Sequence, residues 1–106
     1  MSVQTVLNKE QIFQLLKNHA KEVQAFGVFK LGLFGSIVRG EQNDKSDIDF
    51  LVEFNEGQKN YDNFIHLVFF LEDIFQKEVD LVTRKSLSDR LKKIIDKEIE
   101  YVSFNS

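Results

Sequence analysis

The sequence predicts an α/β (α+β) fold in which a small mixed β-sheet is flanked by helices. Three short segments rich in Val, Ile, Leu and Phe are bounded by glycine or polar residues, which is the pattern of β-strands. Longer segments with apolar residues at helical spacing stand before, between and after these strands. A helix that connects two strands usually crosses over and makes them parallel. The order α-β-β-α-β-α therefore predicts a mixed sheet with helices on one face and the other face open.

Length and composition indicate one small domain over residues 1–106. Hydrophobic residues make up 42% of the chain and eleven residues are Phe, enough to fill a core, while charged residues make up 29%. The absence of cysteine excludes disulfides, thiolate zinc sites and a cysteine nucleophile, and it suits a reducing cytoplasm. No apolar run approaches the roughly eighteen residues of a membrane span. The net charge of −3 disfavours long DNA or RNA as a partner.

The first element is predicted to be a helix from Asn8 to Phe26. Its apolar residues recur at helical spacing, Asn8 is placed to cap its first turn, and Gly27 is placed to end it. His19 falls on the apolar side of this helix, and no second histidine is near it in the sequence. We therefore expect His19 to be a half-buried packing residue and not a metal ligand.

Two strands are predicted after this helix. The first, Val28–Phe34, is rich in Val, Leu and Phe and ends at Gly35. A short helical turn through Arg39 and a polar loop over 41–46 should follow. The second strand, Asp47–Phe54, alternates strictly between two faces. One face is apolar, with Ile48, Phe50, Val52 and Phe54, and the other carries Asp47, Asp49, Leu51 and Glu53. The apolar face should pack on the core, so the two aspartates should face away from it.

The rest of the chain predicts a helix, a strand and a second helix. The helix Tyr61–Gln76 is apolar nearly all round, so Phe69 and Phe70 are expected to pack internally, a surface for a partner being the other reading. A third strand is expected over Lys77–Thr83. The last helix should begin after a cap at Ser86 or Ser88 and run to Glu98. Its inward residues should be Leu91, Ile94, Ile95 and Ile99, and residues 101–104 are expected to add a short edge segment.

Three acidic residues in these strands are candidates for a metal site. Asp47 and Asp49 are two residues apart, so their backbones lie about 6.5–7 Å apart on one face of the strand. Carboxylates in such positions can lean together onto metal ions about 3.5–4 Å apart. Asp80 lies between two apolar residues of the third strand and should face the same open side. All-oxygen ligands favour Mg²⁺ or Mn²⁺ over zinc, and Asp80 is also the candidate to accept a proton from an attacking hydroxyl.

The segment between the first two strands is a candidate phosphate-binding turn. Gly35 allows a sharp turn and a close approach of the backbone to a ligand. Ser36 supplies a hydroxyl and opens a helical turn, whose free N–H groups attract phosphate. Arg39, one turn later, can add positive charge. Gly-Ser alone or Asp-x-Asp alone is a weak signal. The segment 35–40 followed by Asp47 and Asp49, in this order and separated by a short loop, indicates nucleotidyl transfer. The plainer alternative is a capped turn beside a solvated strand edge.

At this point the chain resembles the minimal nucleotidyltransferases of the DNA polymerase β superfamily. The residues that carry the resemblance are Gly35–Gly40 (GSIVRG), Ser46–Val52 (SDIDFLV) and Val79–Val82 (VDLV), and it extends over about residues 10–102. It implies a polymerase-β-like fold with the nucleotide in an open groove.

The resemblance also implies roles for individual residues. Gly35 and Ser36 would hold the triphosphate of ATP, Asp47 and Asp49 would bind Mg²⁺, and Asp80 would complete the metal site and activate the acceptor. Many members are the antitoxin of a toxin–antitoxin pair whose toxin is a small helical HEPN ribonuclease. Such an antitoxin transfers AMP from ATP to a tyrosine of the toxin, and the two proteins can form a hetero-oligomer.

Two other functions are compatible with parts of the sequence. A binding module could neutralise its partner by contact alone, since the chain is acidic and carries an apolar helix. A glycosyltransferase could use Asp47 and Asp49 to hold a metal and a sugar nucleotide. The short length argues against the glycosyltransferase, which would also leave the turn at Gly35 and Ser36 unexplained.

Overall fold

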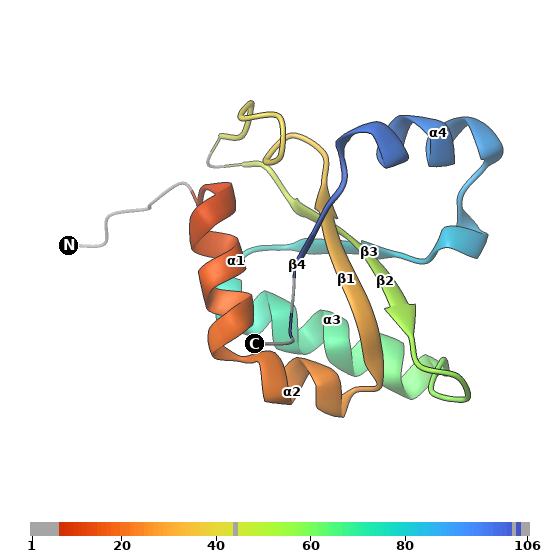
Figure 1. Cartoon of the computed structure of the whole chain (residues 1–106). Coiled ribbons are helices and arrows are strands. Elements are labelled where there is room, and N and C mark those ends of the chain that lie inside the picture. The colour runs from red at the N-terminus through yellow and green to blue at the C-terminus, as the bar shows by residue number, and fades with distance from the viewer. Residues whose placement is uncertain (1–6, 44, 103, 105–106) are drawn as a thin grey trace.

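The computed structural model describes residues 7–43, 45–102 and 104, and it contains one four-stranded sheet. The strands lie in the order β3-β2-β1-β4 (Figure 1). β2 is parallel to β3 and antiparallel to β1, and β4 is antiparallel to β1. This confirms the predicted mixed sheet. The elements are α1 (Lys9–Asn18), α2 (Ala20–Ala25), β1 (Val28–Phe34), β2 (Ile48–Phe54), α3 (Tyr61–Phe75), β3 (Val79–Val82), a 3₁₀ turn η1 (Arg84–Ser86), α4 (Asp89–Glu98) and β4 (Glu100–Val102).

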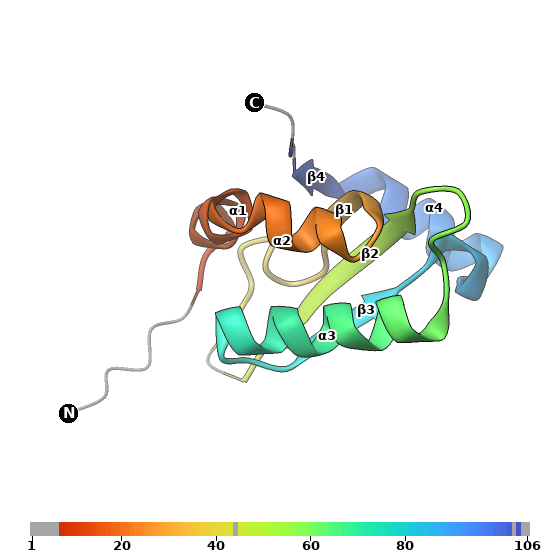
Figure 2. The same ribbon diagram turned by 90° about the horizontal axis from the view of Figure 1, so that it is seen from below.

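The main core lies between one face of the sheet and the helices α1, α2 and α3, which all cover that face (Figure 2). Leu31 and Leu33 of β1 are paired with Val52 and Phe50 of β2, and all four side chains are almost completely buried. Apolar residues of the three helices pack against them. The alternation in β2 thus places its apolar face on the core, as the sequence predicts.

The first predicted helix is in fact two helices, because the chain leaves the helical conformation at His19. Its backbone angles are φ −112° and ψ 22°. The imidazole Nδ1 lies 2.9 Å from Glu22 Oε1, and the ring packs edge-on against Phe70 with 5.7 Å between centroids. These contacts anchor the bend, and they confirm that His19 is a packing residue. The helical spacing of apolar residues continues through the bend, so the sequence predicts one helix.

The second face of the sheet is only partly open, which corrects the prediction that helices cover one face alone. Leu51, between Asp49 and Glu53 on this face, is 0% exposed, and α4 lies on the same side of the sheet (Figure 2). The chain has to cross this face to bring β4 beside β1. Gly32 makes room for the crossing, since a Cβ there would lie 2.6 Å from Ile99 Cδ1.

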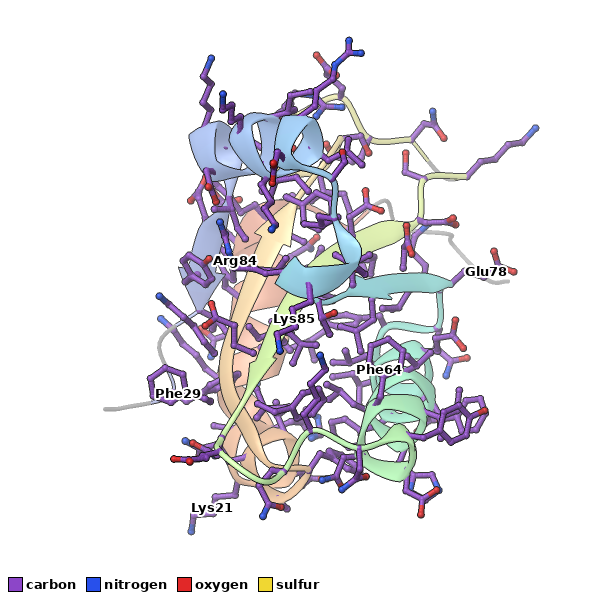
Figure 3. All side chains as sticks on the ribbon, turned by 90° about the vertical axis from the view of Figure 1, so that its right-hand side faces the viewer. Lys21, Phe29, Phe64, Glu78, Arg84 and Lys85 are labelled. Carbon is purple, nitrogen blue, oxygen red and sulfur yellow. The ribbon has the colours of Figure 1, made fainter. Side chains whose placement is uncertain are left out.

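Helix α4 is capped by Ser88, one of the two residues expected to cap it. The Ser88 hydroxyl accepts a hydrogen bond from Leu91 N–H at 3.2 Å. It is held to η1 by the ion pair of Arg84 with Asp96, at 2.8 and 3.1 Å. Figure 3 shows Arg84 beneath this helix. Of the four residues expected to face inward, Ile95 is buried, and Ile99, just after the helix, lies over Gly32 of the sheet. Leu91 and Ile94 are 46% and 48% exposed, because the helix meets the sheet along a narrow side.

Three further expectations differ from the structure in detail. Phe69 is 59% exposed, so only Phe70 of that pair packs against the core. The third strand is shorter than Lys77–Thr83, and the edge strand begins at Glu100. Of the predicted edge segment, residue 103 lies outside the described residues.

In the part of the chain that is described, no helix is both long and apolar enough to cross a membrane.

Candidate active site

The three predicted acidic residues lie beside one another on the sheet. Asp49 of β2 and Asp80 of β3 are direct partners in the parallel register, and Asp47 comes just before β2. Asp80 and Asp47 are exposed and Asp49 is partly buried. The alternation that buries Ile48 and Phe50 turns Asp49 to the opposite face, as predicted. Asp80 is therefore outside the core and adjacent to Asp49.

The electrostatic environment of Asp49 is unfavourable for its charged form. Burial, and then the negative charges of Asp80 and Asp47, raise the pKa of Asp49 from the ordinary 3.8 to about 6. The nearby Arg39 guanidinium opposes this rise only in part, and the Glu98 carboxylate adds slightly to it. Near neutral pH, three carboxylates therefore repel one another at this corner of the sheet.

The three aspartates fit a divalent cation in the kind of donor atom, but their side chains are not gathered around one point. Among the described residues, no three His, Cys, Asp or Glu side chains form a group that could hold a metal ion. The carboxylates of Asp47, Asp49 and Asp80 nevertheless share one side of two paired strands, and their donor atoms are the hard oxygens that Mg²⁺ and Mn²⁺ prefer. A cation would relieve the repulsion that raises the pKa of Asp49.

The segment after β1 is one tight turn, which we call the 35–41 turn, and not a helix. Gly35 has φ +84°, in the left-handed region. Main-chain hydrogen bonds of 2.9–3.3 Å run from the N–H groups of 39–41 back to carbonyls of 35–37. Within the described residues, the N–H groups of 36–38 donate to no acceptor of the chain. Three consecutive free N–H groups suit an anionic ligand.

Gly35 brings this turn directly against the acidic residues. A Cβ built on Gly35 would fall on Asp49 Oδ2, so no other residue fits here without moving that carboxylate. Phe34, which precedes it, is the cross-strand partner of Asp49. The structure thus brings together both halves of the site that the sequence predicts, the turn and the carboxylates.

Two carboxylates hold the predicted phosphate-binding arginine in place. Arg39 Nε donates to Glu41 Oε1 at 2.9 Å, and Nη1 donates to both oxygens of Glu98 at 2.9 and 3.2 Å. Its second terminal nitrogen, Nη2, makes no hydrogen bond within the described residues and is free for a ligand. Sequence reasoning missed Glu98, which also accepts the Gly35 N–H at 2.6 Å. A glutamate at the end of an amphipathic helix carries no local signal of such a contact, 63 residues away.

The raised pKa of Asp49 gives a prediction for stability. Without divalent cations at pH 7.5, the free energy of unfolding of Asp49→Asn should exceed that of the wild type by about 1–2 kcal/mol, after allowance for solvent screening of this partly exposed group. The variant should therefore unfold at a higher urea concentration. A carboxyl whose pKa is about 6 in the folded state and near 3.8 in the unfolded state stabilises the fold below pH 3.8. That contribution is lost as the pH rises through 6. The gap between wild type and variant should therefore close toward pH 4.

Urea unfolding in EDTA between pH 4 and pH 8 measures this difference. Asp73→Asn, an exposed acid on α3, controls for the removal of one negative charge. A gap that is absent at pH 7.5, or that widens as the pH falls, contradicts the proposed destabilisation of the ionised Asp49 by burial and by the neighbouring carboxylates.

Two adjacent carboxylates on a sheet with a glycine-led turn against them are the arrangement expected of a nucleotidyltransferase. A family model described as "Nucleotidyltransferase domain" matches residues 16–102, and the chain belongs to this family. Protein adenylyltransferase MntA of Thermococcus cleftensis is 41% identical over 98 residues, which is 92% of this chain and 98% of that protein. A relative from Methanocaldococcus jannaschii is 38% identical over 95 residues, 87% of this chain and 95% of its own.

Solved structures share the fold. A structure described as a minimal nucleotidyltransferase has a TM-score of 0.67 at 29% identity and covers 83% of this chain and 93% of its own. A chain of a toxin–antitoxin complex, a point mutant of MntA-HpeT, has a TM-score of 0.62 at 26% identity and covers 92% of this chain and 72% of its own. These comparisons confirm the predicted family and fold.

Proposed function

We propose that this protein is a Mg²⁺-dependent adenylyltransferase that transfers AMP from ATP to a tyrosine hydroxyl of a partner toxin of the HEPN type, and so acts as its antitoxin. The observation that carries the proposal is the contact of the 35–41 turn with Asp49, which joins a phosphate-binding feature to a metal-binding one. The name of the 41% identical relative, protein adenylyltransferase MntA, supports the reaction. The toxin–antitoxin complex at 26% identity supports the partner. Both substrates would be met in the cytoplasm.

The acidic residues would hold the metal. Asp47, Asp49 and Asp80 supply carboxylate oxygens from one side of the sheet, and Mg²⁺, or Mn²⁺ in its place, would neutralise charge on the phosphates when bound. Asp49, which is the most buried of the three, is also the one whose ionised form most needs a cation.

The turn would hold the phosphates. Ser36 offers its hydroxyl and N–H, Gly35 lets the backbone approach closely, and Arg39 has Nη2 free to donate. With the triphosphate on the turn and the carboxylates beside it, the α-phosphorus would lie between them. Catalysis of this kind depends on positioning and on neutralisation of developing charge.

Asp80 would act on the acceptor as well as on the metal. The tyrosine oxygen attacks the α-phosphorus, the bond from this phosphorus to the bridging oxygen of the β-phosphate breaks, and pyrophosphate leaves. The hydroxyl proton passes to Asp80, which is exposed at the edge of this site and reachable by a partner. The partner would present the acceptor tyrosine to this edge of the sheet.

Transfer of label from ATP to the product of the neighbouring gene tests the proposal. The wild type with Mg²⁺ should label that protein, and Asp47→Asn/Asp49→Asn should reduce the rate by about a thousandfold or more. Asp62→Asn/Asp73→Asn, which removes two exposed acids of α3, matches the change in charge and should leave labelling intact. Equal labelling by both double variants would reject the proposed catalytic site. If the first double variant does not label the toxin yet still neutralises it at equal molar amount, contact alone is the antitoxin mechanism.

A further inference from the structure

Glu98, the last residue of α4, connects Gly35 and Arg39 of the 35–41 turn. Its Oε2 accepts the N–H of Gly35 at 2.6 Å, and both of its oxygens accept Arg39 Nη1, at 3.2 and 2.9 Å. The Arg39 N–H in turn donates to the Gly35 carbonyl at 3.3 Å. Gly35, Arg39 and Glu98 therefore form a closed ring of hydrogen bonds around the turn.

The Glu98 carboxylate lies in a protected position. Its side chain is 17% exposed, whereas that of Arg39 is 45% exposed. Hydrogen bonds between charged groups are stronger when partly shielded from water, and removal of one partner leaves the other without compensation. The ring thus attaches the turn to α4 through one part-buried hydrogen bond, from Gly35, and two exposed ones, from Arg39.

The attachment also determines where the turn sits relative to Asp49. Gly35 is pressed against the Asp49 carboxylate on one side and is held by Glu98 on the other. Glu98 accepts the N–H of Gly35. The next three N–H groups of the turn have no acceptor among the described residues. Its bond to Arg39 Nη1 leaves Nη2 free.

We propose that Glu98 is a positioning residue, whose carboxylate holds the 35–41 turn and Arg39 in the arrangement that binds the triphosphate. The inference rests on the proposed function, because it concerns the same nucleotide site. It gives Glu98 no contact with substrate. In the opposite role, the carboxylate would occupy a phosphate position and compete with the nucleotide, and the two roles predict opposite changes in affinity when Glu98 is replaced.

Calorimetric titration of ATP with Mg²⁺ into Glu98→Gln tests this role. The dissociation constant should rise by about tenfold or more relative to the wild type. Glu100→Gln is the matched control, since Glu100 is two residues from Glu98 and forms an ion pair with Lys9, at 2.9 Å, and not with a residue of the turn. Both variants should unfold at slightly lower temperatures, but only Glu98→Gln should lose affinity. In the background of Glu98→Gln, Arg39→Gln should cost much less affinity than it does alone.

The outcomes separate the inference from the proposed function. Tighter binding by Glu98→Gln would show a competing carboxylate and overturn the inference, and so would an affinity equal to that of the wild type or of Glu100→Gln. No binding by the wild type overturns the proposed function and this inference with it. If Glu98→Gln does not fold, Glu98→Asp takes its place. The shorter acid keeps the charge but cannot reach both partners, so an unchanged dissociation constant there would overturn the inference.

Discussion

Asp80→Asn is expected to lower the rate of AMP transfer by about a thousandfold while the variant still folds. The residue is exposed and its side chain does not enter the core, so the substitution should change stability little. Loss of a proton acceptor commonly costs a factor of about a hundred to ten thousand, and loss of a metal ligand adds to it. The effect should be larger on the maximal rate than on the affinity for ATP, because Asp47 and Asp49 remain to hold the cation.

Single-turnover labelling at saturating ATP, together with calorimetry, separates these two quantities. Glu78→Gln is the control, because Glu78 precedes the same edge strand by one residue and is also exposed. Figure 3 shows Glu78 at the outer edge of the molecule. If Asp80→Asn transfers AMP as fast as Glu78→Gln, then Asp80 does not take the proton and the assignment of the third acid is wrong.

Gly35→Ala is expected to reduce both ATP binding and transfer by about a hundredfold or more. Gly35 combines a φ of +84° with a position at which a Cβ would meet Asp49 Oδ2. The added methyl group therefore has to displace either the turn or the carboxylate, and it separates the two halves of the site. A misplacement of about 1 Å is enough for a loss of this order.

A second glycine of the chain allows the steric effect to be separated from backbone strain. Gly57, in the loop after β2, has a φ of +79°, and a Cβ there would meet nothing within 4 Å. Gly57→Ala should lose about 1–2 kcal/mol of stability from the left-handed conformation alone. It should keep its affinity for ATP. Equal loss of affinity in Gly35→Ala and Gly57→Ala would show that strain, and not the contact with Asp49, is responsible.

Local chemistry was sufficient to predict much of this molecule. Asn8 and Ser88 cap helices because their side chains accept main-chain N–H groups within one turn, at 2.8 and 3.2 Å. The strict alternation around Asp49 reveals which way each side chain faces before the partner strand is known. Asp80 could be assigned to the same face for this reason, and the parallel register of β2 and β3 then places the two carboxylates side by side.

The features that the sequence did not reveal depend on contacts between distant segments. Glu98 is 59 residues from Arg39, and nothing near it in the chain distinguishes it from an ordinary solvent-exposed acid. The exposure of Leu91 follows from the narrow contact of α4 with the sheet, which apolar spacing cannot indicate. At the bend, His19 packs against Phe70 of another helix. In each case the deciding partner lies on an element whose position only the folded chain defines.

The central claim is that the 35–41 turn and the three aspartates form one site for ATP and a divalent cation. Calorimetric titration of ATP into the protein, with Mg²⁺ and separately with EDTA, tests it most directly. We expect the wild type and Asp62→Asn/Asp73→Asn to bind in Mg²⁺ and to bind weakly or not at all in EDTA. Asp47→Asn/Asp49→Asn should bind ATP weakly or not at all in both buffers. Equal affinity of all three proteins in both buffers would contradict the account.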